Sequence, residues 1–301
     1  MRRLAAMDIG SNSTRLLVAD ADAGRLQEVD RLLTITRLGD GVDASGRLAQ
    51  DAMDRVAGCV GRYAERAREL GAETPLAVAT SAVRDAANGR EFLGRLEREH
   101  GVRTRLLAGE DEARLTLRGV ASGRELDGPV VVCDIGGGST ELIAGTADHV
   151  SFAVSLDMGC VRLSERHLRD DPPTAGQVQD VRREVTALLP GDVPDGALIG
   201  VAGTITTLAT IDLDLEEEVP ELVDGHVLDR ATVEAELERL AGLPLERRRE
   251  VRGLMPERAP TIVAGAAILA QLMAELGADR LSVSERDILH GAALAAGDSG
   301  S

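Results

Sequence analysis

The chain has 301 residues, 51 Asp and Glu against 34 Lys and Arg, and a formal net charge of -17 at pH 7. All 34 cations are arginine, so the Walker A phosphate loop, which requires a lysine, is excluded. The net acidity excludes a nucleic-acid binder that relies on a basic surface, and a content of no Trp, one Tyr and two Phe argues against base stacking. The length and the 44% hydrophobic fraction predict one or two globular domains.

The negative charge is concentrated in the second half of the chain. Residues 1–122 contain 19 arginines and 19 acidic residues, whereas residues 123–301 contain 15 arginines and 32 acidic residues. One stretch, 184–229, holds eleven acidic residues and no arginine. We interpret this stretch as a solvated acidic face that lies away from the site, and a metal-binding acidic cluster is the alternative.

Three features predict a cytoplasmic protein without a membrane span. The cysteines (Cys59, Cys133 and Cys160) are far apart, which argues against a disulfide framework or a zinc site and suits a reducing compartment. Only four apolar residues follow the N-terminal Met-Arg-Arg, too few for a signal peptide. The longest uncharged runs, 196–211 and 259–274, have 16 residues each and are interrupted by glycine, so we expect neither to cross a bilayer.

Hydrophobic periodicity and turn residues predict an α/β protein. In the first half we expect strands over 4–7, 16–19, 32–37, 76–80 and 103–107, and helices over 50–70, 90–99 and from residue 110 onward. In the second half we expect strands over 130–133, 142–144, 197–202 and 281–284, and helices over 177–189, 230–241, 261–276 and 285–296. A glycine-rich boundary near 119–128 gives two domains, 1–122 and 123–301, with the last helix able to pack back on the first.

Two segments of the sequence repeat each other at an offset of 126 residues. Residues 8–19 read DIGSNSTRLLVA and residues 134–145 read DIGGGSTELIAG, with six of twelve positions identical. Each copy joins two apolar runs through a turn of small residues, a pattern typical of a β-hairpin. Because the offset is near half the chain length, we predict two similar domains that each open with this hairpin.

The small residues of the two turns suit phosphate binding. Glycine and serine let the backbone approach an anion, and successive N–H groups form a concave nest that hydroxyl groups supplement. Asp8 and Asp134 end the strands before the turns, where a carboxylate suits a hydrated Mg²⁺ that neutralises phosphate. Two such turns across a cleft would hold neighbouring phosphates of a phosphoanhydride. The predicted phosphate-binding residues of the turns are Ser11, Asn12, Ser13, Gly136, Gly137, Gly138, Ser139 and Thr140.

Two further segments follow predicted strands, where α/β proteins place their sites. In the sequence ATSAVRD at 79–85, Arg84 lies in the predicted first turn of a helix, where a cation opposes the helix dipole unless it faces an anion. The sequence GEDEAR at 109–114 places three acids at a helix start. The helix dipole favours acids there, so the pattern does not select one of them for catalysis.

A third turn of small residues, GVAGTITT at 200–207, also follows a predicted strand. Its residues Gly203 and Thr204 could bind a phosphate or a nucleoside through helix N–H groups. The five histidines show no paired metal spacing and no G-x-S-x-G elbow occurs, so a zinc site or a serine triad has little support.

Together these segments resemble one family, the exopolyphosphatase/guanosine pentaphosphate phosphohydrolase (Ppx/GppA) phosphatases of the actin/Hsp70/sugar-kinase superfamily. The resemblance covers nearly the whole chain and is far more specific than a single glycine-rich turn. The matching segments are DIGSNS at 8–13, ATSAVRDA at 79–86, GEDEARL at 109–115, DIGGGSTEL at 134–142, MGCVRLSER at 158–166, AGTITT at 202–207 and SER at 284–286.

The resemblance implies two ribonuclease-H-like domains around a central cleft and removal of a terminal phosphate with Mg²⁺ or another hard divalent cation. It selects Glu112 among the three acids as the catalytic residue, which would orient and deprotonate the attacking water. It places Asp134 and Glu141 at metal-binding positions, beside the turn-based candidate Asp8. It places Arg84 at a phosphate-contacting position.

The repeat itself adds one contrast. Arg15 and Glu141 occupy the same position in the two copies. We infer a division of labour in which Arg15 offers a cation to phosphate and Glu141 offers a carboxylate to the metal.

The implied function is an exopolyphosphatase that hydrolyses the terminal phosphate of inorganic polyphosphate, with a preference for short chains. The alternatives are hydrolysis of guanosine pentaphosphate in the stringent response, a non-catalytic polyphosphate or nucleotide sensor, and a kinase that passes an ATP phosphate to a small acceptor. The resemblance also implies a homodimer. Long members carry a C-terminal His-Asp helical domain, which we do not expect here, and Thr206 stands where some members carry a basic residue.

Overall fold

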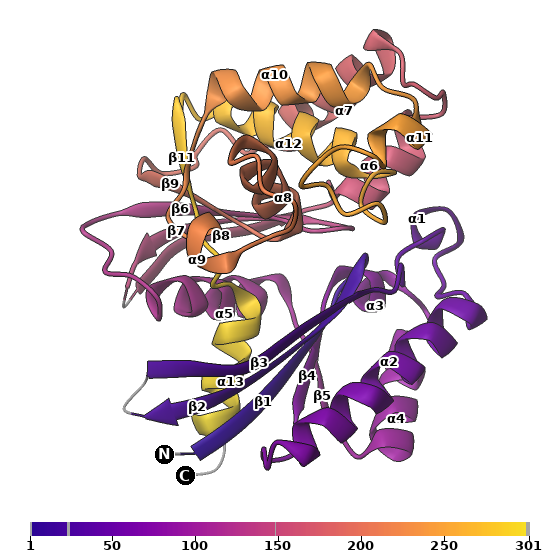
Figure 1. Ribbon diagram of the computed structural model, residues 1–301, viewed down its shortest axis with the longest axis vertical. Coiled ribbons are helices and arrows are strands. Elements are labelled where there is room, and N and C mark those ends of the chain that lie inside the picture. Colours follow the sequence, from indigo (N-terminus) through magenta and orange to yellow (C-terminus); the bar gives the residue numbers. More distant parts are fainter. Residues whose placement is uncertain (1, 23–24, 148, 299–301) are drawn as a thin grey trace. The chain divides into compact units, whose positions relative to one another are not determined.

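The chain forms two compact units, each a β-sheet packed with helices, which confirms the predicted α/β class (Figure 1). The structure is a computed structural model, and its described residues are 2–22, 25–147 and 149–298. The first unit combines Met1–Glu125 with Arg286–Ser301, and the second is Leu126–Glu285. The cleft between two domains stays a prediction.

The observed units differ from the predicted bounds of 1–122 and 123–301 at the C-terminal end. Residues 286–298 belong to the first unit, which confirms the expectation that the last helix packs back on it. Its helix α13 (Ile288–Asp298) shares a buried apolar cluster with Ala6 and Leu17 of the N-terminal strands. Burial of these small apolar side chains stabilises the return of the chain to the first unit.

The first unit is built on a five-stranded sheet with the strand order β3-β2-β1-β4-β5. Strands β1, β2 and β3 are antiparallel neighbours, whereas β1, β4 and β5 run parallel. The strands are β1 (Arg2–Ile9), β2 (Ser13–Asp22), β3 (Arg25–Ile35), β4 (Leu76–Ala79) and β5 (Arg103–Leu106). Besides α13, the helices are α1 (Val42–Ser45), α2 (Gln50–Glu69), α3 (Ser81–Asp85), α4 (Gly89–His100) and α5 (Gly109–Ala121).

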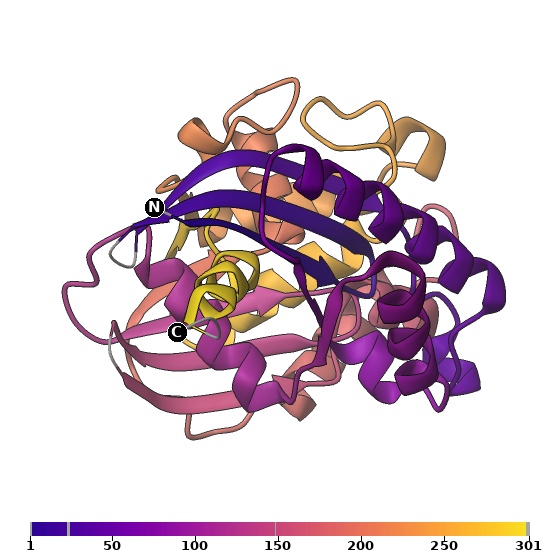
Figure 2. The same cartoon turned by 90° about the horizontal axis from the view of Figure 1, so that it is seen from below.

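Helices cover both faces of this sheet, because its central strands are apolar on both sides. Met7 and Ile9 of β1 join a cluster with residues of α2 and α4. Ala6 of the same strand points to the opposite face and joins the cluster with α13. In Figure 1 the α2–α4 pair and α13 lie on opposite sides of β1 and β4, and in Figure 2 α13 is seen nearly end-on next to the N-terminal strands.

The second unit is built on a six-stranded sheet with the strand order β10-β11-β9-β6-β7-β8. The strands are β6 (Val130–Ile135), β7 (Thr140–Thr146), β8 (His149–Leu156), β9 (Ala197–Val201), β10 (Val227–Asp229) and β11 (Arg280–Val283). The helices are α6 (Cys160–His167), α7 (Ala175–Leu188), α8 (Gly203–Asp212), α9 (Pro220–Val223), α10 (Arg230–Ala241), α11 (Leu245–Arg248) and α12 (Ile262–Glu275). Helix α12 is buried along most of its length and forms the centre of the apolar core.

The sequence repeat extends to the topology of the two sheets. The order β8-β7-β6-β9-β11 in the second unit reproduces the order β3-β2-β1-β4-β5 in the first, with three antiparallel strands followed by two parallel ones. The predicted hairpins are β1–β2 and β6–β7. Their registers agree as well, since Asp8 lies opposite Arg15 and Asp134 lies opposite Glu141.

Most of the predicted elements are present with shifted ends, and the differences have physical reasons. Strand β3 begins at Arg25 and not at residue 32, because its first half is an exposed edge rich in charged residues that hide the strand pattern. Strand β8, strand β10 and helix α6 lie in segments for which we predicted no element. Within the described ranges, no helix is long and apolar enough to cross a membrane.

Helices α5 and α13 cross at two glycines. A Cβ on Gly119 would lie 1.8 Å from the carbonyl oxygen of Asp287, and a Cβ on Gly291 would lie 1.9 Å from the carbonyl oxygen of Leu115. Each clash is with backbone, so no side-chain rotation can relieve it. The C-terminal segment is therefore in direct backbone contact with the helix that begins with the three acids.

Replacing Gly119 with alanine tests this crossing. We expect Gly119→Ala to destabilise the protein by about 1–3 kcal/mol, because the added methyl group forces the two backbones apart. Gly94→Ala in α4 is the matched control, since its Cβ would meet only the flexible end of Arg98 and alanine favours a helix. Urea unfolding followed by circular dichroism measures both, and equal stability of the two variants would contradict the crossing.

Candidate active site

The turn of the second hairpin is held through its carbonyl groups. The carbonyl oxygens of Gly136 and Gly137 accept hydrogen bonds from the N–H groups that begin α6, those of Cys160 and Val161, both at 2.9 Å. The carbonyl oxygen of Gly138 accepts from Nε of Arg162 at 2.7 Å. Three successive carbonyl groups of the turn are thus directed at α6 and its arginine.

This arrangement fixes the direction of the N–H groups of the same turn. In a planar trans peptide the C=O of one residue and the N–H of the next point in opposite directions. The N–H groups of Gly137, Gly138 and Ser139 are therefore presented on the side away from α6. Three N–H groups in a row form a nest that suits an anion such as phosphate.

The turn of the first hairpin is built in the same way. Its closing bond, from the N–H of Gly10 to the carbonyl of Ser13 at 2.9 Å, has its counterpart between Gly136 and Ser139 at 3.0 Å. The carbonyl of Ser11 accepts from Gly39, and that of Asn12 accepts from two later N–H groups. The N–H groups of Asn12 and Ser13 are consequently turned to the opposite side.

The ATSAVRD segment lies directly beside the first turn. The buried hydroxyls of Ser11 and Ser81 are hydrogen-bonded at 3.0 Å. Helix α3 has only five residues, so Arg84 stands in its last turn and not in its first, and the dipole argument used for Arg84 was wrong.

Arg84 instead contacts the candidate catalytic acid. Its Nη1 donates to Oε2 of Glu112 at 3.0 Å and to the carbonyl of Leu107 at 3.2 Å. The side chain of Glu112 is buried, whereas those of Glu110 and Asp111 are exposed. Of the three acids at the start of α5, only Glu112 is thus buried beside an arginine, which separates acids that the sequence pattern left equivalent.

Arg15 is held between two carboxylates of the first unit. Its Nε and Nη2 donate to Oδ2 of Asp8 at 3.0 and 2.7 Å, and its Nη1 donates to Asp287. Three of the five N–H donors of Arg15 thus serve carboxylates, and its inferred contact with phosphate stays a prediction.

The three charges influence one another's ionisation. Burial raises the pKa of Asp8, and the attraction of Arg15 offsets only part of this effect. Burial acts in the same direction on Asp287, but Arg15 and His290 outweigh it and lower its pKa. Burial alone would lower the pKa of Arg15, but the two carboxylates raise it.

The second hairpin carries a pair of buried carboxylates at the equivalent register. Asp134 and Glu141 lie opposite each other on β6 and β7, and Oε1 of Glu141 accepts a hydrogen bond from Ser155 at 2.7 Å. Among the residues that the structure describes, no group of three or more His, Cys, Asp or Glu side chains could hold a metal ion. A pair of carboxylates still suits Mg²⁺, which usually takes one or two carboxylates together with water and substrate phosphates.

The third turn precedes α8 and contains a strained residue. Ala202 has φ 70° and ψ 171°, a region that only glycine adopts readily. Gly203 follows it, and a Cβ there would lie 1.5 Å from Nη1 of Arg258. A buried guanidinium thus lies against the start of α8, beside Thr204.

Arg258 is a cation that the sequence analysis missed. It belongs to none of the matching motifs, and 54 residues separate it from Gly203. Its position before α12 could be recognised only once that helix was packed against the third turn, where Gly265 contacts Thr204. Arg162 lay in a matching segment, and the structure gives it the task of holding the second turn.

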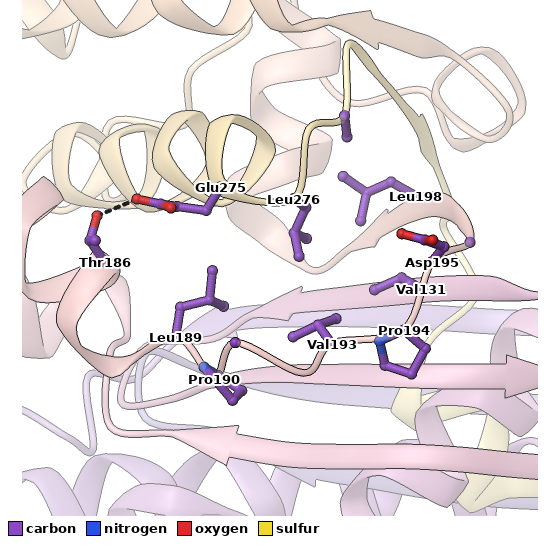
Figure 3. Close-up of a pocket in the computed structure, with 13 residues that line it drawn as sticks. Val131, Thr186, Leu189, Pro190, Val193, Pro194, Asp195, Leu198, Glu275 and Leu276 are labelled. Carbon is purple, nitrogen blue, oxygen red and sulfur yellow. Dashed lines mark hydrogen bonds between the residues drawn. The ribbon is translucent and has the colours of Figure 1, made fainter.

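A surface pocket of about 350 Å³, lined by residues such as Val131 and Leu198, lies near the N-terminal ends of β6 and β9 (Figure 3). The second and third turns follow the other ends of these two strands.

The predicted acidic face differs in part from the expectation. Most of the acidic residues in the stretch 184–229 are exposed, but Glu218 accepts a hydrogen bond from Thr206 in the first turn of α8 at 2.7 Å. The interpretation of this stretch as a distal face therefore fails at Glu218.

The cysteines have no role in this chemistry. Burial, with the charge of Asp134 as a second cause, raises the pKa of Cys133 to about 12. Burial also raises the pKa of Cys160. Neither thiol is suited to act as a nucleophile near neutral pH.

Comparisons with known proteins agree with this arrangement. Residues 17–296 match the model of the Ppx/GppA phosphatase family. The chain is 37% identical to exopolyphosphatase 2 of Mycobacterium tuberculosis, and the match covers 98% of both chains. It is similar to the crystal structure of an exopolyphosphatase-like protein with a TM-score of 0.90 and 32% identity, covering 98% of both chains. It is also similar to the Ppx/GppA family member of Aquifex aeolicus, with a TM-score of 0.84 and 32% identity over 99% of this chain and 98% of that one.

The strain at Ala202 gives a prediction about stability. We expect Ala202→Gly to stabilise the protein by about 1 kcal/mol, because relief of about 1–3 kcal/mol of backbone strain exceeds the greater flexibility of glycine in the unfolded chain. Ala209→Gly, at a helical position of α8, is the control and should destabilise it. Thermal unfolding measures both changes, and a lower melting temperature for Ala202→Gly would rule out the strain.

Proposed function

The chain belongs to the Ppx/GppA phosphatase family, and we propose that it is an exopolyphosphatase that releases the terminal phosphate of inorganic polyphosphate by attack of water. The observation that carries this proposal is the matched pair of turns, each with its carbonyls held by neighbouring segments and its N–H groups on the other side. Polyphosphate is a chain of anionic groups, each of a kind that such a turn would bind. A relative that is 37% identical over nearly the full length carries the same activity in its name.

Glu112 is the residue we assign to the attacking water. It is a buried carboxylate, and the hydrogen bond from Arg84 fixes the orientation of its side chain. In this role it would accept the proton of the water as the new oxygen–phosphorus bond forms, and the shortened polyphosphate would leave as the anion. Arg84 is the cation beside Glu112, and we propose that it also contacts a phosphate oxygen.

Mg²⁺ is the cofactor we propose, with Asp134 and Glu141 as its protein ligands. Bound there, it would neutralise phosphate charge and orient the phosphoryl group for attack. The two side chains are neighbours across a hairpin, and Ser155 fixes one of them by a hydrogen bond. For Asp8, both hydrogen bonds from Arg15 end on Oδ2, so Oδ1 is the oxygen it can offer to a cation.

Arginines supply the positive charge that a polyanion requires. Arg258 lies at the start of α8, near the proposed phosphate contacts Gly203 and Thr204. A cation at a helix N-terminus attracts phosphate together with the helix dipole. We assign Arg258 to phosphate binding, where it supplies the charge that Thr206 does not.

The finer points of the proposal remain to be measured. Short polyphosphate is the expected preferred substrate, and Glu218 beside the third turn agrees with it, because its charge repels further phosphates. Guanosine pentaphosphate ends in the same phosphoanhydride group and is the alternative substrate. A homodimer and a cytoplasmic location are expectations from the family resemblance and from the sequence.

The proposal is tested by phosphate release in the presence of Mg²⁺. Short polyphosphate, long polyphosphate, guanosine pentaphosphate and ATP are compared side by side at equal concentrations of terminal phosphate. We expect the highest kcat/KM for short polyphosphate. Higher kcat/KM for guanosine pentaphosphate would reverse the substrate assignment, and binding without phosphate release would mean that the protein is a sensor.

Replacing Glu112 tests the assignment of the base. We expect Glu112→Gln to keep the fold and to lower kcat by about 10²–10⁴-fold, since the amide cannot accept the proton. Glu110→Gln in the same turn of α5 is the matched control, because its exposed side chain pairs only with Arg114 at the surface. Comparable kcat values for the two variants would disprove the assignment.

Replacing Asp134 tests the metal site. We expect Asp134→Asn to raise the Mg²⁺ concentration for half-maximal activity by about tenfold or more, because the amide is a poorer ligand for a hard cation. Asp195→Asn, an exposed change at the far end of the same sheet, should leave it unchanged. An identical Mg²⁺ dependence in both variants would remove Asp134 from the metal site.

A further inference from the structure

Asp287 stands just before α13 and uses its two carboxylate oxygens for different partners. Its Oδ1 accepts the N–H of Leu289 at 3.0 Å, which caps the start of the helix. Its Oδ2 accepts a hydrogen bond from Nη1 of Arg15. Only 3% of the side chain is exposed, so the ion pair is shielded from water.

Arg15 transmits this contact to Asp8. The remaining bonds of its guanidinium, from Nε and Nη2, both end on Oδ2 of Asp8. A planar guanidinium that is bonded on two sides cannot rotate without breaking the bonds on at least one of them. The position of the Asp8 carboxylate, and with it the direction of Oδ1, therefore depends on what holds the other edge of Arg15.

His290 contacts the backbone of Asp287. The Nδ1 of His290 accepts the backbone N–H of Asp287 at 3.4 Å. Its Nε2 lies 3.1 Å from Oε1 of Glu28, within hydrogen-bond distance. His290 is fully buried, so this chain of contacts connects strand β3 to the start of α13.

The two hairpins differ in their need for such support. In the second hairpin, Glu141 occupies the place of Arg15 and takes a hydrogen bond from Ser155 of the next strand. In the first hairpin the equivalent position holds a buried cation between two acids. If either acid were removed, Arg15 would pair with the remaining acid alone, and that pair could adopt a different geometry.

We propose that Asp287 is a positioning residue for catalysis, which fixes Asp8 through Arg15. The inference rests on the proposed function, because it assumes that Asp8 acts in phosphate hydrolysis. The residue that fixes the first hairpin then comes from the C-terminal segment and not from the hairpin repeat.

The test is Asp287→Asn, because asparagine still caps a helix but cannot form the ion pair. We expect kcat for short polyphosphate to fall by about 10–100-fold with little change in KM, and the affinity for Mg²⁺, measured by calorimetry without substrate, to fall by about tenfold. Asp287→Ser, which also caps but is too short to reach Arg15, should behave in the same way. Asp298→Asn is the matched control on the same helix, where the acid pairs with Arg118 at the surface, and it should retain wild-type values.

A double-mutant cycle separates positioning from general damage. In an Arg15→Gln background, Asp287→Asn should lower kcat by less than twofold further, because the connection is already broken. If the fold-reductions in kcat of the two single variants multiplied in the double variant, the proposal would be overturned. It would also be overturned if Asp287→Asn had the same kcat as Asp298→Asn.

The two proposals can fail separately. If the wild-type protein releases no phosphate from polyphosphate, the proposed function falls and the calorimetric comparison decides the role of Asp287. Equal Mg²⁺ affinity in the wild type and in Asp287→Asn would then overturn it, and weaker affinity that disappears in the Arg15→Gln background would support it.

Discussion

The direction of the N–H groups in both turns depends on one constraint: neighbouring segments bind the carbonyl groups of the turns. In the second hairpin these partners are the start of α6 and Arg162, and in the first they are the residues that follow β3. Once the carbonyls are held, peptide planarity places the adjacent N–H groups on the opposite side. A glycine-rich turn without such partners could rotate its peptides and would present no fixed nest. The small residues thus permit the nest, and distant segments determine its direction.

The two hairpins share this backbone arrangement but carry different charges. In the second, Asp134 and Glu141 lie opposite each other and place two carboxylates in the hairpin. In the first, Arg15 already neutralises Asp8 and contacts Asp287. The net charge of -17 is compatible with a phosphate site, because exposed acids such as Glu216 lie at the surface. There they pair with arginines such as Arg252.

The sequence predicts much of the fold because the signal is local. The hairpins, their equal registers and most helices follow from the repeat, periodicity and turn residues. Contacts between residues far apart in the chain were not predictable, such as Arg258 against Gly203 or Asp287 against Arg15. The burial that singles out Glu112 also comes from packing, since three adjacent acids at a helix start are locally equivalent.

NMR can show whether the turns present their N–H groups to phosphate. Tripolyphosphate with Mg²⁺ is titrated into ¹⁵N-labelled Glu112→Gln protein, in which we expect hydrolysis to be slow. The account predicts that the amide signals of Gly137, Gly138 and Ser139 shift downfield together with those of Asn12 and Ser13, because each would donate to a phosphate oxygen. If these amides keep their positions at saturating tripolyphosphate while others shift, the turns are not the phosphate site.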